Sequence, residues 1–257
     1  MKVAKNALNA ELTNNFIECF EKEIIDDRSD LLRQGDIKRE HRFTLGGLIK
    51  DGIMNLHLAN KQFPASQQAL IQMLTSENVR QHLLSCYGKE FDVVASMTFH
   101  ANPSTSLHTD DIFLDSVPSG ELVGILFALE DFTDENGNIR FFDMGKEQLD
   151  KIYDPIDEPD RHYNDFSELY DKRGEYLKAL ESSIDDYRPR SFKLEKNEFV
   201  SWPSYVPHET IRGTNDEYVS RMSVAAHYCP RDLDYSTRLV SNSRDLSERQ
   251  EIERIAV

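Results

Sequence analysis

The order of residue patterns along the chain limits its fold more than any other feature. Up to Gly88, apolar residues recur at the spacing of amphipathic helices, and after Gly88 short segments rich in β-branched and aromatic residues follow one another. These segments are "FDVVASMTFH", "ELVGILFALEDF" and "GNIRFFDM", and the pattern returns in "SFKLEKNEFVSWPSYVPHETIRG" and "YVSRMSVAAHYCP". The sequence therefore predicts a mostly β fold, with helices packed on antiparallel strands.

The first 90 residues are predicted to form a helical support for the strands. Residues 11–34 have apolar residues at helical spacing, and "FPASQQALIQMLTSENVRQHLLSCYG" predicts one or two further helices. Ser66 is the expected N-cap of this second region, and Gly88 is the expected C-terminal stop.

We expect residues 1–257 to form a single domain. Residues 91–145 and 191–230 supply its β core, and the acidic, Tyr-rich segment 146–190 interrupts that core as an insertion with a helix near Phe166 to Ile184. An insertion of this size often serves as a lid over a functional site, although a solvated helical excursion also fits the pattern.

Composition excludes several classes of partner. The formal net charge of −16 repels nucleic acid and anionic membranes, and it is neutral toward, or favours, a cationic or zwitterionic small-molecule substrate. An acidic surface also serves solubility alone. No apolar run is long enough to span a membrane, and the start of the chain lacks the apolar region of a secretory signal. Three cysteines without a C-x-x-C pair suit a reducing cytoplasm rather than a disulfide scaffold.

The stretch "TSLHTDDIF" contains a candidate metal site. In an extended segment, His108 and Asp110 point the same way because side chains alternate. Iron sites of the facial type use two imidazoles and one carboxylate. The second imidazole would come from His162, His208 or His227, and His208 is favoured because it follows an apolar strand that ends in a Pro-marked turn. The alternative is a polar, solvated turn.

A candidate anion site follows in "SRMSVAAHY". Arg221 and Ser223 share one face of a predicted strand, and a guanidinium with a hydroxyl suits a small carboxylate. A structural pair between Arg221 and an acidic residue is the alternative. Trp202 and Tyr205 could line the same space, or simply belong to the core.

Four segments together carry a family resemblance. In this order, "LHTD", "FALEDFTDENGNIRFF", "FVSWPSYVPHETIRG" and "SRMSVAAHY" resemble the Fe(II)/2-oxoglutarate-dependent oxygenases over roughly residues 93 to 230. The middle segment is most similar to the phytanoyl-CoA dioxygenase-like branch, and "PSYVPHE" also looks like the prolyl-hydroxylase-like branch. The resemblance implies a double-stranded β-helix (jelly-roll or cupin-like) core.

The resemblance also implies roles for individual residues. The iron ligands would be His108, Asp110 and His208, and Arg221, assisted by Ser223, would bind the distal carboxylate of 2-oxoglutarate. Further contacts to 2-oxoglutarate are expected from the strand before "LHTD", which carries the two candidates Thr98 and His100.

The activity implied is oxidation by O2. The enzyme would hydroxylate, or otherwise oxidise, an unactivated C–H bond of a small polar substrate, with release of succinate and CO2. Asp110 stands where related halogenases have a small residue, which favours hydroxylation. Two alternatives stay open: a zinc-dependent hydrolase on the same ligands, and a non-catalytic jelly-roll protein that binds metal as a sensor. The sequence leaves the oligomeric state undetermined.

Overall fold

The computed structural model describes residues 4–25, 31–33, 37–39, 42–58, 62–157, 166–236 and 254–257. Its centre is a nine-stranded sheet, all of whose neighbouring strands are antiparallel. Four strands form the middle of this sheet: β10 (Glu198–Pro203), β7 (Val123–Ala128), β12 (Ser223–Pro230) and β5 (Phe91–Phe99). They are the segments whose β-branched and aromatic residues predicted strands.

Short strands extend the large sheet on both sides. β1 (Ala4–Ala7) pairs with β10, while β4 (Ile53–Met54) and β14 (Ile255–Ala256) both pair with β5. Beyond β4 lie β2 (Leu31–Arg33) and β3 (Ile37–Arg39). The sheet therefore draws on both ends of the chain as well as its middle.

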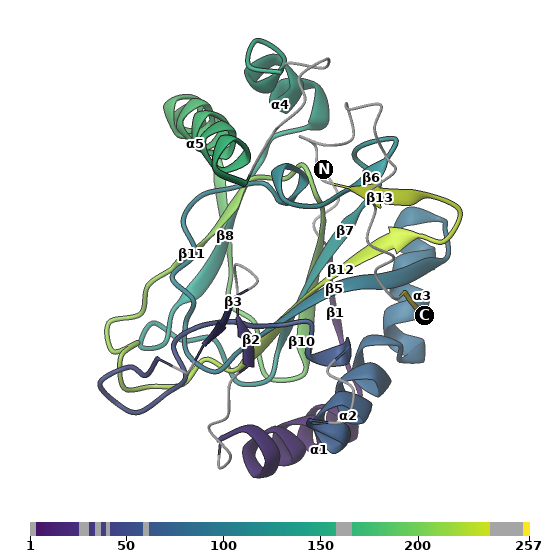
Figure 1. Cartoon of the computed structure of the whole chain (residues 1–257), viewed down its shortest axis with the longest axis vertical. Coiled ribbons are helices and arrows are strands. Elements are labelled where there is room, and N and C mark those ends of the chain that lie inside the picture. The colour runs from purple at the N-terminus through teal and green to yellow at the C-terminus, as the bar shows by residue number, and fades with distance from the viewer. Residues whose placement is uncertain are drawn as a thin grey trace.

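A second, three-stranded sheet faces the large one. Its order is β11 (His208–Ile211), β8 (Asn138–Phe142) and β9 (Pro189–Phe192), and β8 and β11 lie beside the large sheet in Figure 1. An apolar cluster that includes Leu126, Phe141 and Val200 fills the space between the two sheets. This is the predicted jelly-roll core. A two-stranded ribbon of β6 (Asp115–Val117) and β13 (Asp234–Ser236) completes the β structure of the described residues.

Three helices cover the outer face of the large sheet. They are α1 (Ala10–Phe20), which continues into a π-helical turn (Glu21–Ile25), α2 (Pro64–Leu74) and α3 (Glu77–Tyr87). Their buried side chains, such as Phe16 and Leu70, share one apolar cluster with Val224 and Tyr228 of β12. Because strand side chains alternate, the odd-numbered residues of the first half of β12 face the other way, toward the second sheet.

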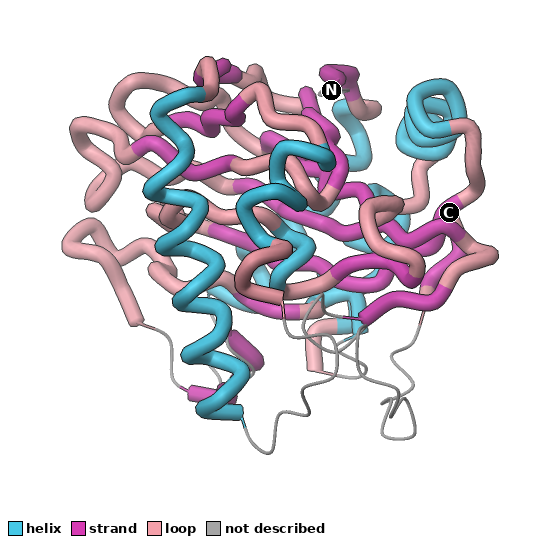
Figure 2. Tube along the Cα trace, turned by 90° about the horizontal axis from the view of Figure 1, so that it is seen from above, coloured by secondary structure: helices cyan, strands magenta, loops and turns pink. Residues whose placement is uncertain are grey.

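The insertion forms two helices, α4 (Lys146–Tyr153) and α5 (Phe166–Ser183), above one end of the β core (Figure 1). In the view from above they lie in front of the strands (Figure 2). Leu149, Tyr153 and Leu180 of these helices pack with Leu107 and Ile112, which flank the predicted metal site. The helix predicted near Phe166 to Ile184 is confirmed by α5.

Two boundaries in the N-terminal region differ from prediction. The helix predicted for residues 11–34 ends at Ile25, residues 26–30 lie outside the described part, and Leu31–Arg33 form a strand. A short apolar run suits either structure, and pairing of Arg33 with Ile53 decides for the strand. Helix α2 begins at Pro64 after Phe63, two residues before the expected cap. Gly88 does end α3, with a left-handed φ of 72°.

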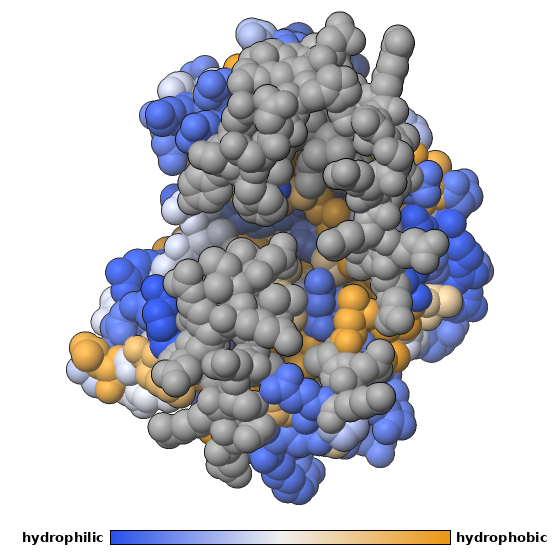
Figure 3. All heavy atoms as spheres, viewed as in Figure 1, coloured by the Kyte–Doolittle hydropathy of each residue, from blue (hydrophilic) through white to orange (hydrophobic). Residues whose placement is uncertain are grey.

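The described surface visible in Figure 3 is mainly hydrophilic along the right rim and at the upper left. This agrees with the 30% of charged residues in the sequence. No helix in the described ranges is long and apolar enough to cross a membrane.

Candidate metal centre and active-site cavity

Backbone hydrogen bonds bring the segment around His108 against the start of β11. The backbone N–H groups of His108 and His208 each donate to the other residue's carbonyl oxygen, at 3.0 and 2.9 Å. The N–H of Asp110 donates to the carbonyl of Ser204 at 2.9 Å. Thr109 is extended, so His108 and Asp110 point the same way, as expected, although Asp110 already begins a 3-10 turn (Asp110–Ile112).

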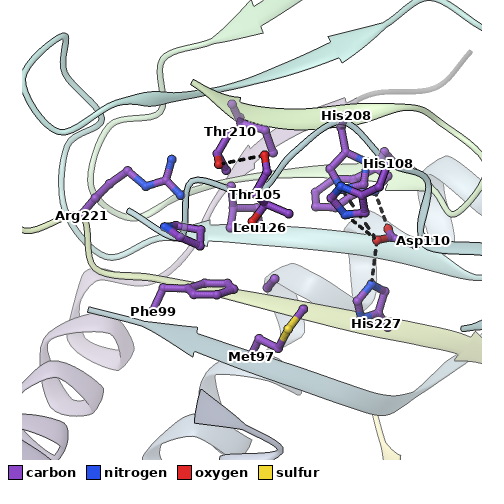
Figure 4. A pocket seen from close by; sticks show the side chains of 14 residues that line it. Met97, Phe99, Thr105, His108, Asp110, Leu126, His208, Thr210, Arg221 and His227 are labelled. Carbon is purple, nitrogen blue, oxygen red and sulfur yellow. Dashed lines mark hydrogen bonds and ion pairs between the residues drawn. The ribbon is translucent and has the colours of Figure 1, made fainter. Parts of the chain in front are cut away.

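The side chains of His108, Asp110 and His208 converge on one point. One potential ligand atom from each lies within 4.8 Å of the other two. The Oδ1 atom of Asp110 is 3.7 Å from Nε2 of His108 and 3.7 Å from Nε2 of His208 (Figure 4). Two imidazoles and one carboxylate at this spacing suit a divalent metal ion and leave further coordination positions open. His162, one of the alternatives for the second imidazole, lies outside the described residues.

Both histidines are oriented by carbonyl groups of their own segments. Nδ1 of His108 donates to the carbonyl of Ser106 at 2.7 Å, and Nδ1 of His208 donates to that of Val206 at 3.0 Å. A carbonyl can only accept, so the proton is on Nδ1 in each ring, and Nε2 is left with a lone pair. Such contacts fix the tautomer and ring orientation that metal coordination needs.

The protonation states also suit a cation. Burial, together with the nearby His208, lowers the pKa of His108 to about 4, so its ring is neutral near pH 7. Burial acts to raise the pKa of Asp110, but His208, His227 and His108 outweigh it and hold that pKa well below its ordinary value. Asp110 is therefore a carboxylate at neutral pH, as a metal ligand must be.

Two further side chains contact the carboxylate of Asp110. Nε1 of Trp202 donates to Oδ2 at 2.8 Å, and Nε2 of His227 lies 3.3 Å from Oδ1. Figure 4 shows His227 on the opposite side of Asp110 from His108 and His208. His227 was a candidate for the second imidazole and Trp202 a candidate for the cavity wall, but neither contact with Asp110 was predicted. The sequence does contain an indication for His227. It lies an even number of positions from Arg221, which places both side chains on one face of the same extended segment.

Arg221 is fully buried and lines the same cavity as the three donor residues. Its Nη1 donates to the carbonyl of Asn138 at 3.3 Å, and its guanidinium lies over the Phe132 ring at 4.7 Å. Its Nε and Nη2 have no hydrogen-bond partner within the described part of the chain. Burial lowers the pKa of Arg221 to about 9, which leaves it cationic at pH 7. A buried cation with two unused donors calls for an anionic ligand.

The other three predicted contact residues are placed differently. Ser223 is not among the residues that line the cavity, but it lies between Arg221 and Ala225, which do, and its buried hydroxyl has no partner among the described residues. Thr98 and His100 do not line the cavity, whereas Met97 and Phe99 of the same strand do. Because strand side chains alternate, Thr98 and His100 point to the outer face of the large sheet, which N-terminal residues cover. There Nδ1 of His100 accepts from the N–H of Ile49 at 3.2 Å.

Comparison with solved structures finds the same fold in proteins of low sequence identity. The non-heme alpha ketoglutarate dependent carbocyclase SnoK from nogalamycin biosynthesis superposes with a TM-score of 0.60 at 13% identity, covering 99% of this chain and 91% of that one. The non-heme alpha ketoglutarate dependent epimerase SnoN from the same biosynthesis gives 0.59 at 12% identity, covering 99% and 89%. EctD from S. alaskensis, solved with bound Fe, gives 0.56 at 10% identity, covering 98% and 78%.

Sequence comparison is more specific. A search of curated protein sequences finds no significant match. The family model described as phytanoyl-CoA dioxygenase (PhyH) matches residues 12–221, which include the three donor residues and Arg221. This match decides between the two branches that the sequence resembled. The chain belongs to the phytanoyl-CoA dioxygenase (PhyH) family and is an iron- and 2-oxoglutarate-dependent dioxygenase.

Proposed function

We propose that His108, Asp110 and His208 hold Fe(II), and that Arg221 binds the distal carboxylate of 2-oxoglutarate with help from the Ser223 hydroxyl. The reaction is the hydroxylation, or a related oxidation, of an unactivated C–H bond in a small polar substrate, with release of succinate and CO2. The single observation that carries this proposal is the buried guanidinium of Arg221, which shares a cavity with the three donors and whose Nε and Nη2 have no hydrogen-bond partner among the described residues.

The donor set fits iron with two bound reactants. Three protein ligands leave three positions of an octahedral ion, two for a 2-oxo acid and one for O2. When bound, the iron and its cosubstrate supply the oxidising chemistry. A zinc hydrolase could use the same three ligands, but it gives no reason for a buried guanidinium in the same cavity.

The protein's own residues orient the reactants and exclude water. Arg221 lies at the opposite end of the cavity from Asp110 in Figure 4, so a diacid anchored there would extend toward the metal. Apolar side chains, including Met97, Phe99 and Leu126, line the cavity and keep its interior dry. Thr105 and Thr210 also line it and are partly exposed. The Thr210 hydroxyl donates to the carbonyl of Thr105 at 3.3 Å, so it offers a polar substrate its oxygen as an acceptor, whereas the Thr105 hydroxyl can donate or accept.

We further propose that the 146–190 insertion covers the metal side of the cavity. The ring of Phe113 packs edge-on against His108, with centroids 5.9 Å apart. The guanidinium of Arg173, on α5, lies 5.1 Å from the centroid of the same Phe113 ring. One aromatic side chain thus links the insertion to a metal-ligand candidate, a position from which α5 can shield bound substrate.

Anaerobic titration with Fe(II) and 2-oxoglutarate tests the proposal. The wild-type protein is expected to develop the visible metal-to-ligand charge-transfer band of an iron-bound 2-oxo acid, and O2 is then expected to release succinate when candidate substrates are supplied. Asp110→Ala should show neither signal. Metal binding without the band would contradict the cosubstrate assignment, and the band without succinate across a wide substrate panel would favour the sensor alternative.

A further inference from the structure

The carboxylate of Asp110 is held by the only tryptophan of the chain. Nε1 of Trp202 donates to Oδ2 of Asp110 at 2.8 Å, and the indole is 2% exposed. Oδ1, the other oxygen, faces Nε2 of His108 and His208 at 3.7 Å from each. The two oxygens of one carboxylate therefore have different environments: Oδ1 is turned toward the imidazoles, and Oδ2 is occupied by a hydrogen-bond donor.

The indole is fixed by its neighbours rather than by the hydrogen bond alone. On the adjacent strand, Gly124 pairs in register with Trp202, and a Cβ at Gly124 would lie 2.6 Å from Cε2 and 2.9 Å from Nε1 of the indole. On other sides the indole packs against the rings of Phe141 and His208, with centroids 5.1 and 4.8 Å away. A glycine inside a strand often marks a close approach of this kind. The strand thus leaves room for the indole at the point where its N–H reaches Asp110.

We propose that Trp202 is a positioning residue that makes Asp110 a one-oxygen metal ligand. This inference rests on the proposed function, in which Asp110 binds iron. A carboxylate whose Oδ2 is free can bind a metal through both oxygens, and it then occupies a fourth coordination position. Three open positions are needed for a chelating 2-oxo acid and O2. With Oδ2 held by Trp202, Asp110 uses Oδ1 and all three positions stay open.

His227 does not perform the same task. Its Nε2 lies 3.3 Å from Oδ1, the oxygen that faces the imidazoles, and it is not part of the compact group formed by His108, Asp110 and His208. Within the described part of the chain, Trp202 alone donates a hydrogen bond to Oδ2. Removing the indole N–H therefore frees Oδ2, whereas a change at His227 does not.

The first test measures metal binding without turnover. Co(II) is titrated calorimetrically into metal-free wild type, Trp202→Phe and Val200→Ala. The Phe variant keeps an aromatic ring but lacks the donor that orients Asp110. We expect this loss of orientation to outweigh the extra donor atom that a free Oδ2 provides, and Co(II) to bind about 10- to 100-fold more weakly. Val200 is buried in the same cluster and on the same strand, so its truncation controls for loss of packing. Val200→Ala should bind Co(II) as the wild type does.

The second test reads the coordination directly. The visible spectrum of bound Co(II) depends on the number and arrangement of its ligands. Trp202→Phe is expected to show an altered Co(II) spectrum. The 2-oxoglutarate concentration needed to change that spectrum should be at least about 10-fold higher than for the wild type. Gly124→Ala keeps the indole but displaces it, so this variant should shift both readouts in the same direction. In the wild type, quenching of Trp202 fluorescence by Co(II) reports binding at the same carboxylate.

The outcomes distinguish the positioning role of Trp202 from the proposed metal site itself. If wild-type protein binds neither Co(II) nor Fe(II), the metal-site proposal fails. If wild type binds metal and Trp202→Phe matches it in affinity, spectrum and 2-oxoglutarate response, the positioning role is overturned while the metal site stands. If Trp202→Phe does not fold, Gly124→Ala decides between the same two results. Equal losses in Val200→Ala and Trp202→Phe would also overturn the role, because packing alone would then explain the effect.

Discussion

Thr109 and Tyr153 share a buried hydrogen bond, with their hydroxyl oxygens 3.0 Å apart. Thr109 stands between the two metal-ligand candidates His108 and Asp110, and Tyr153 is the last residue of α4 in the insertion. The insertion is therefore attached to the segment that carries the metal site, and its effect on that site can be measured.

Tyr153→Phe removes this attachment and leaves the Thr109 hydroxyl without its partner in the insertion. We expect the free energy of unfolding to fall by about 1–3 kcal/mol, because a buried polar group loses a partner. We also expect Fe(II) affinity to fall, because the ligand segment is less constrained. The matched control is Tyr176→Phe, which loses a hydroxyl contact to Asp157 in the same insertion. Similar Fe(II) affinities in the two variants would contradict the link.

Asp110→Asn and Asp111→Asn differ by one position but are expected to differ greatly in metal binding. Asp110 is the proposed ligand, so its neutralisation should weaken Fe(II) binding at least about 100-fold. Loss of a residue that only orients a ligand weakens metal binding by about 100-fold at most. Asp111 is also buried but lies outside the group of donors that converge. Isothermal titration with Fe(II) under anaerobic conditions checks this. Comparable losses in both variants would contradict the assignment of Asp110.

Arg221→Met is expected to act in opposite directions on stability and on binding. In the ligand-free protein, Nε and Nη2 of the buried guanidinium have no partner within the described ranges, so an apolar side chain of similar length should leave the melting temperature unchanged or raise it. Binding of 2-oxoglutarate should weaken by about 2 kcal/mol or more, about 30-fold, because a buried carboxylate loses its charged partner. The measurements are thermal unfolding and titration with 2-oxoglutarate.

The control for Arg221→Met is Arg140→Met. Arg140 bonds to Glu209 and does not line the cavity. We expect it to retain wild-type affinity for 2-oxoglutarate. A variant of Arg221 with unchanged affinity for 2-oxoglutarate would remove the main support for the proposed cosubstrate site.

His57 makes the metal-free protein sensitive to acid. It is fully buried, Nδ1 lies 2.6 Å from the Ser96 hydroxyl, and burial lowers its pKa to about 4. Between pH 6.5 and 4 the unfolded chain binds a proton that the folded protein does not, so stability falls as the pH falls through this range. The measurement is urea unfolding of wild type and His57→Gln from pH 7.5 to 4.5. The free energy of unfolding of the wild type should fall by about 2 kcal/mol more than that of His57→Gln over this range.

Comparing the two proteins at each pH is necessary because Asp115 acts with the opposite sign. Burial, together with the nearby Asp111, raises the pKa of Asp115 to about 7. The folded protein then holds a proton that the unfolded chain releases above about pH 4, so this group lowers stability as the pH rises toward 7. Asp115 is present in both proteins, and the difference between them isolates His57. If the difference in free energy of unfolding between wild type and His57→Gln does not change with pH, the buried, neutral state of His57 is contradicted.

Much of the β core could be predicted because its signal is local. Runs such as "FDVVASMTFH" and "GNIRFFDM" carry their strand preference in consecutive residues, and they form β5 and β8. The stretch at Leu31–Arg33 could not be predicted in the same way. Its few residues suit a helix or a strand, and pairing with β4, distant in sequence, decides the outcome.

The sequence by itself determined which donors the site has and in what order, because residue type and alternate spacing place His108 beside Asp110 and Arg221 beside Ser223. Only the tertiary structure decided which distant groups meet them. The indole of Trp202 reaches Asp110 because Gly124 of a neighbouring strand leaves room for it, and Thr98 turns away because of the side of the sheet that its strand presents. Such contacts depend on register and strand direction, which are set by packing of the whole core and not by any one segment.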